Sequence, residues 1–290
     1  MIHNKTALTF ILSLSICFQM QAQDFALPRP PKDMKSIPQR AGYVVEHYWD
    51  NADLDELAKA FLETAPERKS GDSDPELEQA FVNYLSVFPL TESDSLCAVC
   101  ASRLMYRADS LGEAAVSVIL DLAEKYLFNA DSPMIQEEYF RGFADAADSC
   151  RNVPAAQLSK LPFWYIAMDS NRKGHEIEHF SFETEDGTML DFNDVEGERL
   201  LILYDPDCKD CNRLIEELSA KELDCVVVAV ALNTTRERFR SHAQSLPALW
   251  VKGWDCEGMT NGGAFMIRHF PDLYLVDDSG VILAKHRVEF

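Results

Sequence analysis

The sequence has 290 residues, enough for two domains, and its 47% hydrophobic and 26% charged content is typical of a folded chain. A formal net charge of −21 at pH 7 argues against binding to nucleic acid or to an anionic membrane surface, because both would repel the chain. The acidic residues are scattered, as expected for a solvated surface.

The N-terminus has the pattern of an export signal. A weakly basic start is followed by an apolar stretch over 7–18, too short to span a bilayer, and a cleavage site is predicted after Ala22. A lipid anchor on Cys17 is the alternative, disfavoured because Ile16 is a poor residue before a lipidated cysteine. We therefore expect residues 1–22 to be removed and the mature protein to be periplasmic or secreted. Residues 23–40, rich in proline, are predicted to form an extended leader.

The apolar positions between residues 41 and 173 recur with the period of a helix. They share one helical face over 77–85 and again over 111–128. Pro133 and Pro154 stand where proline is favoured in the first turn of a helix, so two further helices are predicted there. Residues 41–173 therefore predict an all-α domain.

The pattern changes near residue 174. Alternating side chains over 180–193, around the turn Asp186-Gly187, predict a β-hairpin. Further elements are predicted as strands at 199–204, 225–232 and 249–251, helices at 212–221, 234–245 and 261–269, and a hairpin of 273–276 with 281–285. This order implies an α/β domain over 174–290, with a sheet covered by helices.

Two cysteines, Cys208 and Cys211, stand at the junction of a predicted strand and a predicted helix. Free N–H groups and the helix dipole stabilise a thiolate at the start of a helix, so Cys208 is assigned as the nucleophile. Cys211 lies one turn later and is assigned as the resolving thiol. A structural disulfide and half of a zinc site are the alternatives for such a pair.

Negative charge surrounds this pair in the sequence. Asp205, Asp207 and Asp210 flank the cysteines, and only Lys209 offsets them. Nearby negative charge disfavours a thiolate, and a less stabilised thiolate means a less oxidising disulfide. We therefore expect a reductase or isomerase rather than a strong oxidase.

The order of elements, with Cys208 and Cys211 after the first central strand and Pro271 before the last hairpin, resembles the thioredoxin-like fold of envelope thiol-disulfide oxidoreductases. The resemblance implies that Pro271 is cis, faces the cysteines and shapes a substrate groove with Phe270. The first hairpin is similar to the N-terminal extension of envelope reductases and peroxiredoxin relatives.

This chain departs from the thioredoxin pattern in two ways. Asp207 stands where thioredoxin has Trp, and the sequence reaches Phe290 without the usual final helix. One face of the sheet would then be undercovered, so we expect the helical domain to pack on it.

The helical half also resembles a known family. Four motifs carry the likeness: His47-Tyr48-Trp49-Asp50, Glu78-Gln79-Ala80-Phe81, Ala123-Glu124-Lys125-Tyr126-Leu127 and Ser132-Pro133-Met134. They resemble an uncharacterised helical domain that precedes a thioredoxin-like domain in envelope proteins of Gram-negative bacteria. The resemblance implies architecture and location but no reaction.

One motif suggests zinc. His175 to His179 reads HExxH, which in a zinc protease places both histidines on one helical face. The alternation that follows predicts an extended segment instead, in which these residues lie about 13 Å apart at ~3.3 Å per residue. They could not share one ion, so we expect no metal.

The remaining cysteines leave several states open. Cys97 and Cys100 form a second CxxC pair on or near a helix, and they are interpreted as a local disulfide, as buried thiols or as an auxiliary redox relay. The states of Cys150, Cys225 and Cys256 are not decided by their positions.

Together these patterns predict an exported protein that catalyses thiol–disulfide exchange, with no cofactor beyond its redox-active disulfide. Its expected partners are proteins with thiols or disulfides and an upstream electron donor, without nucleic acid; a membrane-proximal location is compatible with the sequence. A non-catalytic envelope binding or scaffold protein is the alternative. A thiol peroxidase fits less well, because Asp205 and Leu201 stand where a peroxidatic Cys208 would need Thr or Ser and Pro.

Overall fold

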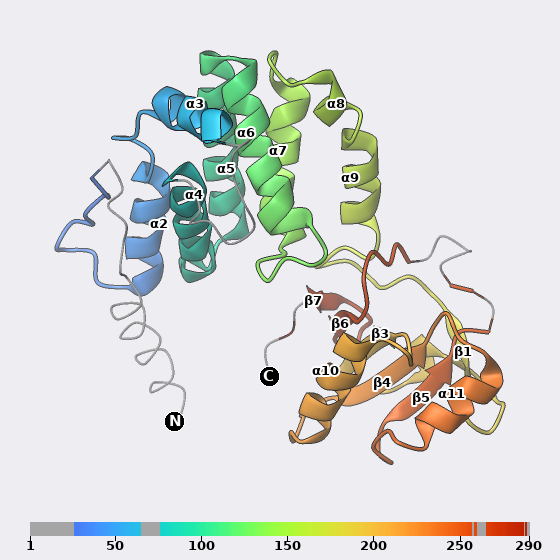
Figure 1. Ribbon diagram of the computed structural model, residues 1–290. Coiled ribbons are helices and arrows are strands. Elements are labelled where there is room, and N and C mark those ends of the chain that lie inside the picture. The colour runs from blue at the N-terminus through green and yellow to red at the C-terminus, as the bar shows by residue number, and fades with distance from the viewer. Residues whose placement is uncertain (1–25, 65–75, 257, 260–264, 287, 289–290) are drawn as a thin grey trace. The chain divides into compact units, whose positions relative to one another are not determined.

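The computed structural model describes residues 26–64, 76–256, 258–259, 265–286 and 288 (Figure 1). The expected signal peptide and the alternative anchor at Cys17 lie outside these residues. The chain forms two compact units, one made of residues 1–122 with 149–154 and the other of 123–148 with 155–290. Helices give way to strands near residue 174, as expected, yet the second unit also includes helical residues from before that point.

The described part of the first unit is helical. Its elements are α2 (Ile37–His47), α3 (Leu54–Thr64), α4 (Glu76–Val87), the short helix η2 (Phe88–Thr91), α5 (Asp94–Leu111) and α6 (Glu113–Ala123). The helix predicted over 77–85 is confirmed as α4, whose apolar face is buried. α2 begins inside the segment predicted as a leader, because the Ser36 hydroxyl accepts a hydrogen bond from the N–H of Gln39 and Pro38 suits a first turn.

The helical part of the second unit contains the π-helical turn η3 (Glu124–Phe128), α7 (Glu137–Ser149), α8 (Ala155–Leu158) and α9 (Leu161–Asp169). The helix predicted to begin at Pro133 begins four residues later, because residues 132–135 form a turn that the Ser132 hydroxyl closes by accepting the N–H of Met134 at 3.1 Å. The segment after Pro154 forms two helices rather than one. Aromatic contacts hold these helices together, with Phe140 at 4.9 Å from Phe128 and 5.1 Å from Trp164 between ring centroids.

The second unit also contains one mixed sheet. Its strands are β1 (Ser181–Thr184), β2 (Met189–Asp191), β3 (Arg199–Tyr204), β4 (Val226–Ala231), β5 (Val251–Trp254), β6 (Asp272–Val276) and β7 (Ile282–Lys285). Their order is β2-β1-β5-β4-β3-β6-β7, with β3, β4 and β5 parallel and the other pairs antiparallel. Both predicted hairpins and the strand at 199–204 are confirmed.

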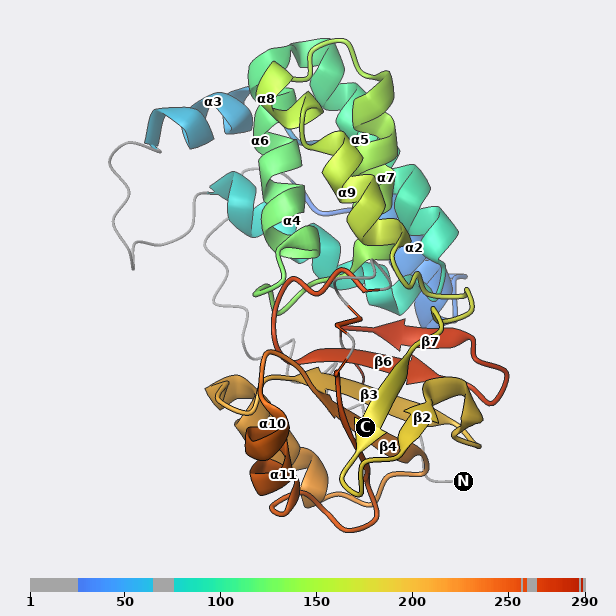
Figure 2. The same cartoon turned by 90° about the vertical axis from the view of Figure 1, so that its right-hand side faces the viewer.

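Two hydrophobic cores lie on the two faces of this sheet. The helices α10 (Lys209–Ser219) and α11 (Arg236–Ala243) cover one face (Figure 2). The core on that face includes Ile215 and Phe239 from these helices and Ile202 from β3. The other core contains Leu201 and Leu203 and is filled by aromatic side chains from neighbouring segments, namely Phe180, Phe182, Phe192 and Phe265. Both cores consist of residues between 177 and 288.

The expectation that the helical segment packs on an undercovered face is therefore wrong for the helices of this unit. The aromatic side chains from the sheet's own domain already fill that face. The helices instead bond to β7, the edge strand, where the Lys285 ammonium donates to Ser170 O at 2.7 Å and to Glu137 Oε2 at 2.8 Å.

Three other elements differ from their predicted positions. α10 begins at Lys209 rather than at 212, and β5 lies at 251–254 rather than 249–251. β5 pairs with β1 through Gly253, where any side chain would collide with the ring of Phe182. The helix predicted over 261–269 is wrong for its described part, because residues 265–269 are not helical. Within the described residues, no helix combines the length and hydrophobicity needed to cross a bilayer.

Candidate functional site

Cys208 occupies the N-cap of α10, which places it at the junction that the sequence predicts. Its N–H donates to Asp205 O at 3.0 Å, which closes the turn that leaves β3. Its sulfur accepts a hydrogen bond from the N–H of Cys211 at 3.2 Å. Cys208 is half-buried, so part of this residue at the start of the helix is open to solvent.

Cys211 lies one turn further along α10 and has a different environment. Its side chain is fully buried in the core under α10, with Ile202 and Tyr204 in the same cluster. Burial raises the pKa of the Cys211 thiol far above its ordinary value, and the hydrogen bond with Cys208 adds to that rise. The pair therefore combines a half-buried cysteine with a fully buried one.

The residues predicted to shape the substrate groove lie beside Cys208. The Phe270–Pro271 peptide bond is cis, as the resemblance implies. The Cys208 thiol is 3.7 Å from the carbonyl oxygen of Phe270, so the residues just before β6 lie next to the start of α10. Phe270 and Pro271 also line an open groove of about 790 Å³, whose other walls come from α10 and from residues 130–135.

The charge around the cysteines differs from the sequence-based expectation. The Arg238 guanidinium is 2.5 Å from Asp207 Oδ1, and the Arg213 guanidinium is 2.9 Å from Asp210 Oδ1. The expectation that only Lys209 offsets the aspartates is therefore wrong. Arg213 lies one turn after Asp210 and could have been found from helical spacing, whereas Arg238 comes from α11 and has no local signal.

A second set of polar side chains joins α10 to α11. His242 Nε2 lies 3.0 Å from Asn212 Oδ1, and His242 Nδ1 lies 3.3 Å from the Tyr204 hydroxyl. Burial lowers the pKa of His242, and the charge of Arg238 adds to the effect. These contacts fix α11, which carries Arg238, beside the CxxC helix.

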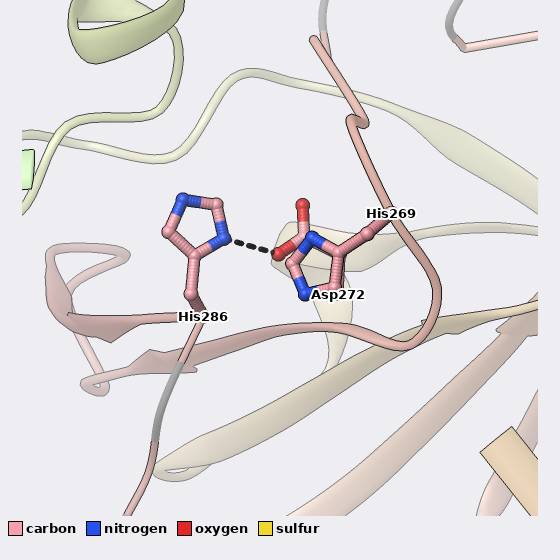
Figure 3. A group of neighbouring side chains, drawn as sticks. All are labelled: His269, Asp272 and His286. Carbon is pink, nitrogen blue, oxygen red and sulfur yellow. Dashed lines mark hydrogen bonds and ion pairs between the residues drawn. The ribbon is translucent and has the colours of Figure 1, made fainter. Parts of the chain in front are cut away.

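A cluster of His269, Asp272 and His286 forms where β6 begins, with Asp272 and His286 buried and His269 half-buried (Figure 3). One potential ligand atom from each residue lies within 4.8 Å of the others, so the group has the donor set to hold a divalent ion. Sequence reasoning missed it, because His286 is distant in the chain. The signal that could have been read is the pair of His269 and Asp272 around Phe270-Pro271.

Within this cluster His286 joins two carboxylates. Its Nδ1 is 2.7 Å from Asp272 Oδ1, and its Nε2 is 3.2 Å from Glu137 Oε1. Burial lowers the pKa of His286, but the hydrogen bonds to Asp272 and Glu137 outweigh that effect and raise it. Asp272 also accepts hydrogen bonds from the N–H of Leu273 and the hydroxyl of Tyr274. The cluster is thus arranged as an internal ion network, and a metal would have to displace the proton of His286.

The other sequence motifs have environments of their own. Cys97 and Cys100 are buried free thiols on α5, and burial raises the pKa of both, that of Cys100 to about 11. The segment 175–179 is not helical, and the His179 ring bonds to the amide of Asn193 at 2.8 Å. The HExxH motif therefore does not form the helix that a zinc protease needs.

Comparison with known proteins shows a family for the N-terminal half and a fold for most of the chain. Residues 3–171 match the family described as domain of unknown function DUF5106. The chain is similar to the crystal structure of a thioredoxin-like protein from Bacteroides caccae, with a TM-score of 0.75, 23% identity, and coverage of 92% of this chain and 95% of that chain. No curated protein matches the sequence.

Two shorter structures match about two fifths of the chain. One is the C-terminal domain of an uncharacterised protein from Bacteroides fragilis, with a TM-score of 0.40, 22% identity, and coverage of 41% of this chain and 92% of that chain. The other is the thioredoxin domain of a thiol-disulfide oxidoreductase from Bacteroides vulgatus, with a TM-score of 0.35, 17% identity, and coverage of 40% and 89%. The fold predicted from the sequence, thioredoxin-like with an additional helical region, is confirmed by the Bacteroides caccae structure. The chain belongs to the DUF5106 family, and its C-terminal region has the thioredoxin-like fold.

Proposed function

We propose that this protein catalyses thiol–disulfide exchange through Cys208 and Cys211. The observation that carries the proposal is the position of Cys208, half-buried at the start of α10 and 3.7 Å from the carbonyl of Phe270. Cys211 is held one turn behind it as a buried thiol. The thioredoxin-like fold, in which such a pair follows the first central strand, also supports this function.

When the protein acts as a reductase, it reduces a client disulfide in two steps. The Cys208 thiolate attacks one sulfur of a client disulfide, forming a mixed disulfide and releasing the other client sulfur as a thiolate, which takes up a proton. Cys211 then loses its proton and attacks the sulfur of Cys208, which releases the second client thiol. The client gains two electrons and two protons, and the protein holds a disulfide that a dithiol donor reduces again.

The direction we propose is reduction or isomerisation rather than strong oxidation. A strong oxidant needs a strongly stabilised thiolate in its reduced form. Around Cys208 the three carboxylates of Asp205, Asp207 and Asp210 are matched by three cations, those of Lys209, Arg213 and Arg238. This balance provides no excess of positive charge to stabilise a thiolate.

We also propose that the protein acts outside the cytoplasm, in the periplasm or as a secreted protein, on protein clients with thiols or disulfides. The N-terminal signal pattern supports the location, and the half-buried sulfur of Cys208 supports large clients rather than an enclosed small substrate. A dithiol protein is the expected electron donor, and no cofactor beyond the disulfide is needed.

The test is reduction of insulin disulfides or of a glutathione mixed disulfide by the mature chain. Cys208→Ser is expected to abolish the activity, whereas the control Cys225→Ser, which removes another half-buried thiol, is expected to retain it. An inactive wild-type protein that still binds clients would instead support the non-catalytic binding protein. Cys211→Ser is expected to accumulate mixed disulfides, which would identify the clients.

A further inference from the structure

The groove lined by Phe270 and Pro271 has a wall, formed by residues 130–135, that belongs to the region matched by the DUF5106 family. We propose that this groove holds the extended segment of a client protein next to its reactive cysteine, and that it selects segments with basic side chains. The inference rests on the proposed function and adds the class of substrate. It also gives the family region a role in the thiol-exchange site.

The groove has three walls within the second compact unit. Phe270 and Pro271 form one wall, α10 forms the second with Leu214, and residues 130–135 form the third with Pro133 and Ile135. The volume of about 790 Å³ is in the range of specific binding sites. Because the carbonyl of Phe270 contacts the thiol of Cys208, a chain lying along Phe270 and Pro271 has its neighbouring residues in this groove.

The third wall is held in place by several hydrogen bonds. The Ser132 hydroxyl donates to Tyr126 O at 2.6 Å, and the N–H of Gln136 donates to Leu127 O at 2.9 Å. The guanidinium of Arg268, two residues before Phe270, donates to Phe128 O at 2.5 Å. The wall from residues 130–135 and the segment that contains Pro271 are therefore fixed to the same turn of the chain.

Two cations also line this groove, but Arg213 is paired with Asp210 and His286 is paired with Asp272. The carboxylates that remain favour a basic occupant. Asp131 and Glu217 lie on different walls, both are exposed, and neither has an ion-pair partner among the described residues. Asp210, by contrast, is paired with Arg213. The stem of a client lysine or arginine would pack on Leu214 while its cation meets these two carboxylates.

The test measures peptide binding to the full mature chain by fluorescence anisotropy. Two labelled peptides of equal length carry a serine in place of the reactive cysteine, flanked either by lysines or by glutamates. Wild-type protein is expected to prefer the lysine peptide. The variant Asp131→Asn/Glu217→Gln is expected to bind that peptide about three- to tenfold more weakly, because it loses two exposed ion pairs with the peptide.

The matched control is Glu216→Gln/Glu222→Gln, which alters exposed residues outside the groove lining. Both double variants remove two negative charges and therefore change the net charge equally. The control is expected to bind the lysine peptide within twofold of wild type. An equal loss in both variants, or no loss in the groove variant, would overturn the proposal.

A parallel measurement separates this inference from the proposed function. Cysteine-containing versions of both peptides, as glutathione mixed disulfides, report exchange, whereas the serine peptides report binding alone. Exchange at the same rate with both peptides would overturn the proposed preference for basic segments but would still support the redox function. Selective binding of the lysine peptide without any exchange would overturn the redox function and support the groove as a site for basic segments.

Discussion

Cys208 and Cys211 are three residues apart but differ in their access to solvent. Cys211 is fully buried, and burial raises the pKa of its thiol. Cys208, by contrast, is half-buried at the start of α10. The thiolate rather than the thiol is the nucleophile in exchange reactions. The local surroundings therefore assign the attack to Cys208 and the second, intramolecular step to Cys211.

This asymmetry predicts selective alkylation. In the reduced protein at pH 8, iodoacetamide is expected to modify Cys208 at least about tenfold faster than Cys211, because each unit by which a pKa is raised lowers the thiolate fraction tenfold. Peptide mapping by mass spectrometry measures both rates. In 8 M urea the two rates should converge, and similar rates in the folded protein would refute the assignment.

Glu137 is the centre of the buried ion network in the second unit. Its carboxylate contacts Lys285 at 2.8 Å, His286 at 3.2 Å and the guanidinium of Arg268. Burial raises the pKa of Glu137, but the hydrogen bond from His286 and the neighbouring cations outweigh it and lower the pKa to about 2. One carboxylate thus neutralises cations from β7 and from the segment before Pro271.

The substitution Glu137→Gln is expected to lower the free energy of unfolding by roughly 3–5 kcal/mol, because it leaves buried cations without their partner. Urea unfolding at pH 7 measures the change. The control is Glu138→Gln, because the partner of Glu138, Arg172, is partly exposed. This substitution should lower the free energy of unfolding by about 1 kcal/mol. Equal losses in the two variants would show that Glu137 is not the centre of the network.

The elements that the sequence predicts well are those whose pattern is local. β3 was predicted with its observed bounds, because a continuous run of buried side chains is typical of a central parallel strand. The start of α10 was predicted three residues late, because its N-cap is Cys208 rather than one of the usual Ser, Thr, Asp or Asn residues. β5 was misplaced because its register depends on Gly253 lying against Phe182, which is a tertiary contact.

The sequence predicts the sulfur chemistry of the candidate site but not its ion pairs. The two cysteines and Pro271 are recognisable from short motifs. The partner of Asp207 is 31 residues away, and Lys285 is 148 residues from Glu137, so no local spacing indicates either ion pair. The charge balance of the site could therefore not be derived from the sequence.

The stability of β6 and β7 is expected to depend on pH through the protonation of His286. A raised folded-state pKa means that protonated His286 contributes stability fully below its ordinary value of 6.5, and that this contribution is lost as the pH rises through the folded value. Glu137 acts in the opposite range, with stability present above 4.5 and lost as the pH falls towards about 2.

The prediction is that the exchange protection of β6 and β7 amides, corrected for intrinsic rates, declines between pH 6 and 9 in the wild-type protein. The variant His286→Gln should lack this decline. The control is His47→Gln, which changes a half-buried histidine of the first unit and should keep the decline. A decline that persists unchanged in His286→Gln would exclude His286 as its source. Hydrogen exchange followed by mass spectrometry provides the profiles.

At the scale of the whole molecule, the change from helices to strands is not the border of the second compact unit. Residues 123–148 and 155–173 belong to the same unit as the sheet. Arg268 and Lys285 bond to Glu137, and Lys285 also bonds to Ser170. The thioredoxin-like region therefore depends on helical residues that precede it.

This dependence predicts that the segment 123–290 is more stable than the segment 174–290. The shorter segment lacks Glu137 and Ser170 and leaves the cations of Arg268 and Lys285 without partners. It is expected to unfold at a lower urea concentration or to aggregate, as measured by circular dichroism and size-exclusion chromatography. A fully stable, monomeric 174–290 would show that the helical residues are dispensable for this fold.

The central claim is that Cys208 and Cys211 form a reversible disulfide and that their dithiol form reduces clients. Equilibration of the full mature chain with glutathione buffers, followed by mass spectrometry of alkylated protein, measures its reduction potential. We predict a single two-electron transition in which only these cysteines change state, with a potential clearly below about −120 mV, the value of a strong oxidant. A potential at or above that value, or no disulfide between Cys208 and Cys211 at any buffer composition, would contradict the account.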